Sequence, residues 1–482
     1  MLIKRFYDDK LAQASYLVGC AATGEALVVD PNRDVEQFVE AAEREGLRIT
    51  HITETHIHAD FVSGARELAE RTGGRLYLSA EGGDQWQYAW AEEAGATLLR
   101  DGDTFKVGNV KIDVLHTPGH TPEHLSFVVT DTAGADQPMG VFTGDFIFVG
   151  DVGRPDLLER AAKYAGTMEA GARTLYRSID RFRNLLPDYV QLWPGHGAGS
   201  ACGKALGAVP QTTLGYEKLF NWGLAAASEQ EFVDAVLAGQ PEPPMYFAEM
   251  KRINREGPRV LGGFRRPQRL PENRLEQLID QDALVVDTRH ATDYASGHIP
   301  GTLNVPLGNS FTTWAGSVLP YDQPFYLIVE DPSGRTMDEI IRDLAMIGLD
   351  DVAGCFGADV VQTWIDTDRA AQGVPEVAPD QLEELLRVDA VELVDVRNSS
   401  EWNEGHIPGS RNVPLGRLPE LLDQIPRDRP VVVHCESGGR AAVAIGVLQA
   451  NGFGDVRHLT GDMTAWRRDN RNVIQAGDLV GA

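Results

Sequence analysis

Four short segments in the first half of the sequence carry side chains that can bind a metal ion. The first is Thr55–Phe61 (THIHADF), which holds two histidines and an aspartate. The other three place a histidine or an aspartate where an apolar run ends, and they are Thr117–Thr121 (TPGHT), Phe142–Asp145 (FTGD) and Pro194–Gly197 (PGHG). Imidazole and carboxylate groups are common ligands of zinc and iron. One such histidine alone is usually structural, but four segments on loops after strands together predict a metal site.

The second candidate for chemistry is the segment Cys435–Arg440 (CESGGR) near the end of the chain. It follows an apolar strand run and precedes a helical stretch, so Cys435 is expected to face backbone N–H groups. Those dipoles, with Arg440 nearby, favour a thiolate and stabilise a persulfide anion. We therefore predict that Cys435 is a nucleophile. The loop is shorter than that of cysteine phosphatases, and its length is similar to that of rhodanese-type sulfurtransferases.

This cysteine segment lies in the second copy of an internal repeat. The two copies begin at Asp287 (DTRHATDYASGHIPGTLNVPL) and at Asp395 (DVRNSSEWNEGHIPGSRNVPL). Both alternate apolar strand runs with helical stretches, which predicts a small parallel-sheet α/β domain present twice. In the first copy the loop reads EDPSGR, and Glu330 takes the place of Cys435. A carboxylate cannot form a persulfide, so this copy is predicted to be inactive as a transferase.

Composition shifts divide the chain into three predicted domains. Residues 1–255 alternate short apolar runs with helical stretches, as expected of an α/β sandwich. A connector rich in Pro, Gly and charge follows near residues 240–268. The two repeats then span residues 268–372 and 376–482.

The four metal-binding segments resemble those of the metallo-β-lactamase superfamily over about residues 1–255. This resemblance implies an α/β fold class, with an αββα sandwich followed by two tandem rhodanese-like domains. Hydrolytic members bind two metal ions and have a histidine directly after the aspartate of the first motif. Here that residue is Phe61, which cannot bind a metal. The departure favours the persulfide dioxygenase branch of the superfamily.

In that branch the matching positions imply one Fe(II) per chain, bound by His56, His120 and Asp145. Two histidines and one carboxylate form a facial triad that leaves positions open for substrate and oxygen. The residue types alone also allow zinc. The resemblance further assigns a set of supporting residues that orient ligands and waters. They are His58, Asp60 and His196.

Three more residues are assigned to substrates. Arg154, in the segment Phe146–Leu158, resembles the arginine that holds the carboxylate of a thiol substrate, and a guanidinium suits that task. Thr121 is predicted to place a hydroxyl near the substrate. Cys202 lies shortly after His196 and is either a sulfur acceptor near the iron or a buried small apolar residue.

The whole pattern predicts a persulfide dioxygenase–rhodanese fusion. Its front domain would oxidise a low-molecular-weight thiol persulfide with O2 to sulfite, and Cys435 would form or consume thiosulfate. Two alternatives stay open. One is a zinc thioesterase, similar to hydroxyacylglutathione hydrolase, fused to a sulfur carrier. The other is a sulfur carrier whose metal domain is degenerate.

Composition limits the partners and the compartment. The formal net charge of −27 disfavours binding to nucleic acid or anionic lipid. No apolar run approaches the ~20 residues of a membrane span, and the N-terminal stretch lacks the core of a signal peptide. Four scattered cysteines without a CxxC pair fit a reducing cytoplasm. We expect a homo-oligomer, and structural roles for Cys20, Cys355, His298 and His406.

Overall fold

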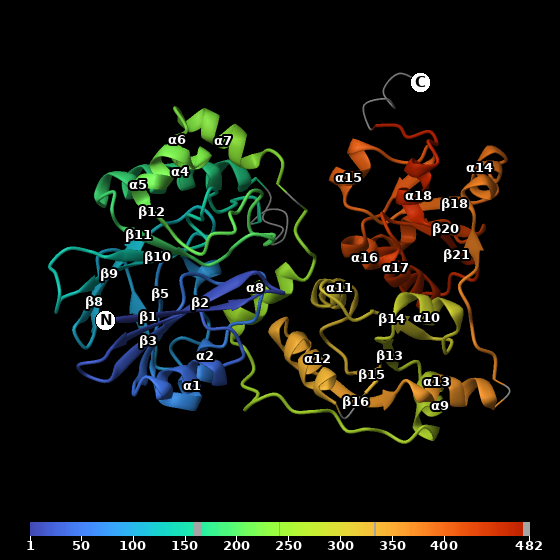
Figure 1. Cartoon of the computed structure of the whole chain (residues 1–482), viewed down its shortest axis with the longest axis horizontal. Coiled ribbons are helices and arrows are strands. Elements are labelled where there is room, and N and C mark those ends of the chain that lie inside the picture. Colours follow the sequence, from blue (N-terminus) through green and yellow to red (C-terminus); the bar gives the residue numbers. More distant parts are fainter. Residues whose placement is uncertain (158–165, 241, 332–333, 368, 476–482) are drawn as a thin grey trace. The chain divides into compact units, whose positions relative to one another are not determined.

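A computed structural model describes residues 1–157, 166–240, 242–331, 334–367 and 369–475 (Figure 1). The chain forms two compact units, which are Met1–Gly263 with Ala345–Gly348 and Phe264–Leu344 with Leu349–Ala482. Apart from Ala345–Gly348, both copies of the repeat therefore belong to one unit. Leu158 of the predicted substrate segment, and Pro332 and Ser333 of the Glu330 loop, lie outside the described residues.

The first unit contains two six-stranded mixed sheets. The first sheet has the order β1-β2-β3-β4-β5-β6 and comprises Leu2–Asp8 (β1), Gln13–Cys20 (β2), Glu25–Val29 (β3), Arg48–Thr53 (β4), Arg75–Ser79 (β5) and Thr97–Leu99 (β6). The second has the order β12-β11-β10-β9-β8-β7 and comprises Thr104–Val107 (β7), Val110–His116 (β8), Leu125–Asp131 (β9), Gly140–Gly144 (β10), Gln191–Pro194 (β11) and Thr212–Thr213 (β12).

Side-chain alternation along the strands explains how these two sheets are layered. In β2, Tyr16 and Val18 point into a core shared with Phe127 and Phe142 of the second sheet. Leu17, between them, points to the opposite face. Because a strand sends successive side chains to opposite faces, one strand buries both of its faces here. The sheets consequently pack face to face and need helices on their outer sides.

Amphipathic helices supply those outer layers. The face of the first sheet packs on helices α1 (Glu36–Arg44) and α2 (Ala65–Thr72), and that of the second on α4 (Met168–Leu185) and α7 (Glu229–Leu237). The remaining helical segments are η1 (Asp84–Trp86), α5 (Leu214–Phe220), α6 (Trp222–Ala225) and α8 (Phe247–Glu256). The order is helix, sheet, sheet, helix, which confirms the predicted αββα sandwich.

The second unit contains two parallel sheets, one for each repeat. The first repeat has the order β14-β13-β15-β16, with Leu284–Asp287 (β13), Thr302–Asn304 (β14), Phe325–Val329 (β15) and Val352–Gly357 (β16). Its helices are α9 (Asn273–Asp280), α10 (Ala291–Ser296), α11 (Phe311–Val318), α12 (Arg335–Met346) and α13 (Asp359–Asp366). This is the predicted α/β arrangement.

The second repeat has the order β17-β21-β20-β18-β19. Its strands are Glu376–Val377 (β17), Glu392–Asp395 (β18), Ser410–Asn412 (β19), Val431–His434 (β20) and Val456–Leu459 (β21). Its helical segments are α14 (Pro379–Arg387), α15 (Ser399–Glu404), η2 (Leu415–Arg417), α16 (Leu418–Leu421), η3 (Leu422–Gln424), α17 (Gly439–Ala450) and α18 (Asp462–Arg468).

The histidines of the two GHIPG turns hold equivalent places. His298 stacks on Tyr294 with 3.8 Å between ring centroids, and His406 stacks on Trp402 at 3.6 Å. In each case Nδ1 donates to the carbonyl oxygen of the same aromatic residue, at 2.9 Å. Both imidazoles are buried. These contacts brace the turn and confirm the predicted structural role.

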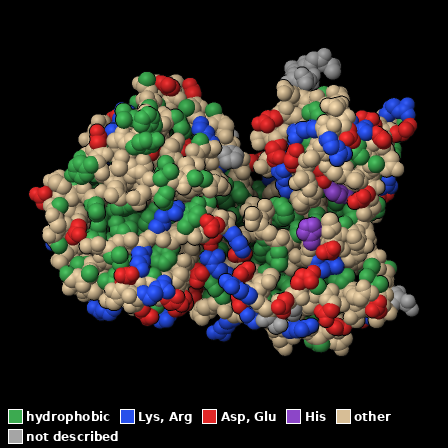
Figure 2. Space-filling view, viewed as in Figure 1, with side chains coloured by type: hydrophobic (Ala, Val, Ile, Leu, Met, Phe, Trp, Pro, Cys, Tyr) green, Lys and Arg blue, Asp and Glu red, His purple; other side chains and the backbone are tan. Residues whose placement is uncertain are grey.

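Figure 2 shows acidic and basic side chains interspersed on the face that it draws. None of the helices in the described part of the chain has the length and apolar character that a membrane span requires.

Candidate metal centre and sulfur-transfer loop

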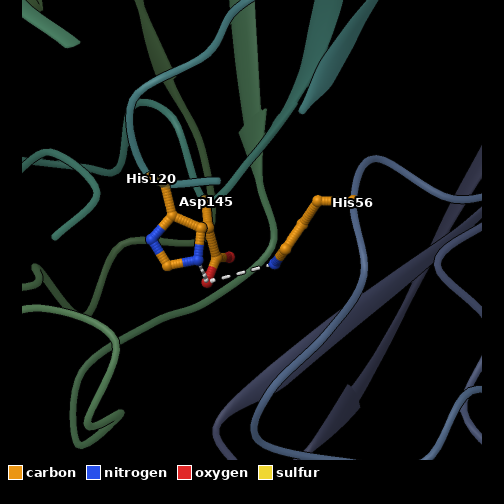
Figure 3. A group of neighbouring side chains, drawn as sticks. All are labelled: His56, His120 and Asp145. Carbon is orange, nitrogen blue, oxygen red and sulfur yellow. Dashed lines mark ion pairs between the residues drawn. The ribbon is translucent and has the colours of Figure 1, made fainter. Parts of the chain in front are cut away.

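Three loops that follow strands bring His56, His120 and Asp145 together (Figure 3). His56 follows β4, His120 lies between β8 and β9, and Asp145 directly follows β10. Oδ2 of Asp145 lies 3.9 Å from Nε2 of His56 and 3.6 Å from Nε2 of His120. All three side chains are buried. The predicted triad is therefore assembled around a single carboxylate oxygen.

A glycine lets β10 turn so that Asp145 points inward. Gly144 has a φ of 49°, in the left-handed region that other residues rarely adopt. A Cβ at this position would lie 2.4 Å from Oγ1 of Thr55, the residue before His56. The FTGD motif thus needs its glycine for backbone conformation and for close approach of the two loops.

Both histidines of the triad present Nε2 to Asp145 as neutral imidazoles. Nδ1 of His120 lies 3.0 Å from the carbonyl oxygen of Arg154, which can only accept, so this nitrogen carries the proton. Nδ1 of His56 lies 3.0 Å from Oγ1 of Thr55. Burial lowers the pKa of both histidines. A neutral imidazole with a free Nε2 lone pair is the form that binds a metal.

The two oxygens of Asp145 have different surroundings. Oδ1 accepts a hydrogen bond from Nδ1 of His196 at 2.7 Å, whereas Oδ2 has no hydrogen-bond partner among the described residues. Burial alone would raise the pKa of Asp145, but His196, followed by His56 and His120, holds it well below its usual range. A buried, ionised oxygen without a donor is costly unless a cation neutralises it. The residues present therefore fit a metal ion.

His196 is held between two carboxylates. Its Nδ1 contacts Asp145 and its Nε2 contacts Oδ2 of Asp60, both at 2.7 Å. Burial alone would lower the pKa of His196, but Asp145 and Asp60 together hold it well above its usual value. An imidazolium that donates from both nitrogens cannot bind a metal. This geometry agrees with the predicted supporting role.

Phe61 and His58 lie beside the triad without adding a ligand to it. Phe61 is fully buried and packs against the His58 ring, with 4.4 Å between centroids. Nε2 of His58 lies 3.2 Å from Oδ1 of Asp30. Burial lowers the pKa of His58, but the Asp30 charge and hydrogen bond prevail and raise it to about 9. His58 is thus a charged partner of Asp30.

Cys202 joins Asp60 and His196 in a second group, whose ligand atoms all lie within 4.8 Å of one another. Its side chain is buried. Burial, followed by the charges of Asp60 and Asp145, raises the pKa of the Cys202 thiol well above its usual value. Its surroundings thus favour the neutral thiol. The sulfur-acceptor role stays a prediction.

Arg154 and Thr121 lie close to the triad. The Arg154 guanidinium is fully buried and pairs with both oxygens of Asp156, at 2.9 and 2.7 Å, and it donates to the carbonyl oxygen of Ala201. Its own carbonyl orients His120. Thr121 is buried directly after His120. Substrate contacts for Arg154 and Thr121 stay predictions.

Four buried polar residues around the triad were not identified from the sequence. They are Asp30, Glu54, Glu123 and His124. Nε2 of His124 accepts from the backbone N–H of Asp145 at 3.2 Å, and its ring stacks on His56. Oε1 of Glu123 accepts from the N–H of Ile57 at 2.8 Å. Asp30 and Glu54 both come directly after a strand, a signal that could have identified them.

In the second unit, Cys435 lies between β20 and α17, as predicted. The N–H of Gly438 donates to its Sγ at 3.1 Å, and its own N–H donates to Oδ1 of Asp462 at 2.7 Å. Both guanidinium amino groups of Arg440 pair with the Glu401 carboxylate, at 2.6 and 2.9 Å. The positive charge expected beside the thiol is therefore largely neutralised.

The protonation of Cys435 differs from the expectation. Burial, followed by the charge of Asp462, raises the pKa of the thiol, while the N–H groups of Ala441, Ser437 and Gly438 lower it. The net direction is upward, so this loop does not by itself favour a thiolate. The loop dipoles act as predicted, but they are outweighed by burial and by a carboxylate distant in the sequence.

The first repeat lacks this arrangement. Glu330 directly follows β15 and is exposed. The side chain of Arg335 is 92% exposed, with Glu339 at 3.4 Å. By contrast, the Arg440 side chain is 23% exposed. The described part of this loop thus holds neither a nucleophile nor an inward-facing arginine.

Comparisons with known proteins agree with this organisation. The model of the metallo-beta-lactamase superfamily matches residues 8–196, and that of the rhodanese-like domain matches residues 272–351 and 378–469. The crystal structure of a metallo-beta-lactamase from Staphylococcus aureus subsp. aureus COL is 44% identical and covers 74% of this chain and 99% of that chain, with a TM-score of 0.65.

Two curated relatives carry different activities in their names. A hydroxyacylglutathione hydrolase from Rhodopseudomonas palustris is 30% identical over 50% of this chain and 80% of that protein. The mitochondrial persulfide dioxygenase ETHE1 from Bos taurus is 27% identical over 41% of this chain and 68% of that protein. The chain spans less than two thirds of the length of three beta-lactamase hydrolase-like proteins that it also matches.

The chain belongs to the metallo-β-lactamase superfamily. More narrowly, it is a fusion of a metallo-β-lactamase domain with two rhodanese-like domains.

The triad geometry predicts that Asp145→Asn loses the metal while the fold is retained. Asparagine can keep the contact to His196, but it removes the charge that faces the two imidazoles. We expect the metal content after iron loading, measured by atomic emission, to fall at least tenfold. The exposed Asp136→Asn is the matched control and should keep its metal. Equal metal content in the two variants would contradict the assignment.

The surroundings of Cys435 predict that Asp462→Asn lowers the pKa of its thiol. The substitution removes one of the two causes that raise the pKa, and asparagine tolerates the φ of 55° at this position. Alkylation of Cys435 by iodoacetamide, followed by mass spectrometry, should therefore reach its half-maximal rate at a lower pH, by about one unit. The exposed Asp423→Asn serves as control. A shift to higher pH would rule out the electrostatic role of Asp462.

Proposed function

We propose that the front domain is an iron(II) persulfide dioxygenase. We further propose that the second repeat is a rhodanese-type sulfurtransferase with Cys435 as its nucleophile. The observation that carries the proposal is the Asp145 oxygen, which faces two neutral histidines while Phe61 occupies the place of a further ligand. One ion with a facial triad fits these side chains. The likeness to a persulfide dioxygenase adds support.

Bound at this triad, iron(II) would supply the redox chemistry that allows O2 to react with a persulfide. Residues of the chain position the metal-binding side chains. His196 donates to the Asp145 carboxylate, and His124 accepts from the backbone N–H of Asp145. The carbonyl oxygen of Arg154 holds the His120 ring. The buried walls exclude bulk water from the site. The net reaction is R–S–SH + O2 + H2O → R–SH + sulfite + 2H⁺.

Cys435 would then couple this sulfite to a second persulfide. Its thiolate attacks the outer sulfur of R–S–SH, the donor S–S bond breaks, and R–S⁻ leaves. Sulfite next takes the sulfane sulfur from the Cys435 persulfide, which gives thiosulfate and regenerates the thiolate. The N–H groups of Ser437, Gly438 and Ala441 stabilise the sulfur anion at each stage. Covalent linkage to the dioxygenase would raise the local concentration of sulfite.

A zinc thioesterase is the second candidate, because one relative is a hydroxyacylglutathione hydrolase. Asp60, His196 and Cys202 would then have to hold a second ion. That role requires His196 to lose the proton that it shares with Asp60.

The direct test is oxygen uptake by the iron-loaded protein with a panel of thiol persulfides, starting with glutathione persulfide. We expect oxygen consumption and sulfite formation in equal amounts when thiosulfate formation is blocked. Hydrolysis of a glutathione thioester without oxygen uptake would favour the zinc thioesterase.

The two-step scheme predicts the product of Cys435→Ser. This variant should consume oxygen at close to the normal rate and release sulfite, while thiosulfate formation falls by more than a hundredfold because no sulfur carrier remains. Ion chromatography distinguishes the two products. Cys355→Ser, a buried cysteine of the first repeat, is the matched control and should still form thiosulfate. Unchanged thiosulfate formation by Cys435→Ser would contradict the assigned transferase site.

A further inference from the structure

The second unit holds a cavity of about 780 Å³ that both repeats line. The active repeat contributes Ser437, Gly438 and Gly439 of the cysteine loop, together with Asp462. The inactive repeat contributes a wall that includes Trp314. A volume of this size is typical of small-molecule sites, which often lie where two domains meet.

Two of the lining residues touch the nucleophile. The N–H of Gly438 donates to Sγ of Cys435 at 3.1 Å. Asp462 accepts from the N–H of Cys435 at 2.7 Å through Oδ1, while its Oδ2 lies 3.0 Å from Nε2 of His458. The cavity thus begins at the loop that would carry the sulfur.

The inactive repeat is packed tightly against the helix that follows Cys435. A Cβ on Gly439 would lie 2.7 Å from the Trp314 indole, so the ring rests directly on the first turn of α17. Further along α17, a Cβ on Gly446 would lie 3.0 Å from the backbone nitrogen of Asn304 in β14. A side chain at Gly439 would collide with the indole, and one at Gly446 would be crowded by the β14 backbone. The wall formed by Trp314 is therefore a fixed part of the cavity.

The charges of the lining distinguish between possible ligands. Among the described residues, no lysine or arginine lines the cavity, and its titratable groups are His290, Tyr294, Glu376, His458 and Asp462. Such a lining does not attract dianions such as thiosulfate or sulfite. It suits an organic group of peptide-like polarity, with the indole covering its apolar part.

We propose that this cavity binds the organic part of the thiol persulfide that delivers sulfur to Cys435, and that Trp314 of the inactive repeat determines its affinity. The inference rests on the proposed transferase role of Cys435. In the step served by the cavity, the Cys435 thiolate attacks the outer sulfur of R–S–SH, the donor S–S bond breaks, and R–S⁻ leaves while Cys435–S–SH keeps the proton. No oxidant is needed. The repeat without a cysteine is thereby a positioning element for its neighbour.

The test compares two donors in the full-length protein. With glutathione persulfide as donor and sulfite as acceptor, Trp314→Ala should raise KM about tenfold, which corresponds to about 1.4 kcal/mol of binding free energy. With thiosulfate as donor and cyanide as acceptor, kcat/KM should stay within twofold of the wild type. Trp364→Ala is the matched control, because this half-buried tryptophan of the inactive repeat lies in α13 and does not line the cavity. Trp314→Phe should show a smaller KM increase than Trp314→Ala.

Three results would overturn the inference. These are an unchanged KM for glutathione persulfide in both Trp314 variants, an equal loss with both donors in both variants, and an equal KM increase in Trp364→Ala. A failure of the proposed function is distinguishable, because the wild-type protein would then lack thiosulfate:cyanide activity altogether.

Discussion

The first unit is organised around one buried negative charge, the carboxylate of Asp145. His196 satisfies one of its oxygens and leaves the other facing two neutral imidazoles. His196 can do so only because Asp60 holds its second nitrogen, and the loop reaches this place only because Gly144 accepts a left-handed backbone. A buried carboxylate oxygen without a donor is unfavourable, so a cation bound at this point would stabilise the first unit.

Phe61 and Glu330 are two positions at which the chain departs from the motifs that its domains resemble. Phe61 places an apolar ring beside His58, which leaves the triad as the site best suited to a metal in the described part of the first unit. Glu330 removes the nucleophile from the first repeat, whose Arg335 is exposed. At both positions the surrounding fold is retained, while a residue type that the corresponding chemistry requires is absent. The first repeat still packs against α17 and therefore serves as a structural partner of the second repeat.

The sequence was sufficient for the fold class and for the proximity of His56, His120 and Asp145, because each lies in a loop that follows a strand and the sheet topology brings these loops together. It was insufficient for the interactions that set protonation. Asp462 lies well beyond Cys435 in the sequence, so the loop motif alone predicted a thiolate where burial and this carboxylate raise the pKa. Asp30 and His124 were missed because their partners, His58 and Asp145, are distant in the sequence. The cavity beside Trp314 depends on packing between repeats, which no local pattern encodes.

The number and identity of the metal ions per chain test the central claim most directly. Purified full-length protein, loaded anaerobically with a mixture of iron(II) and zinc, should be analysed by atomic emission together with oxygen uptake on a thiol persulfide. One iron per chain, with oxygen uptake proportional to iron content, is the predicted result. Two zinc ions per chain, with thioester hydrolysis and no oxygen uptake, would contradict it.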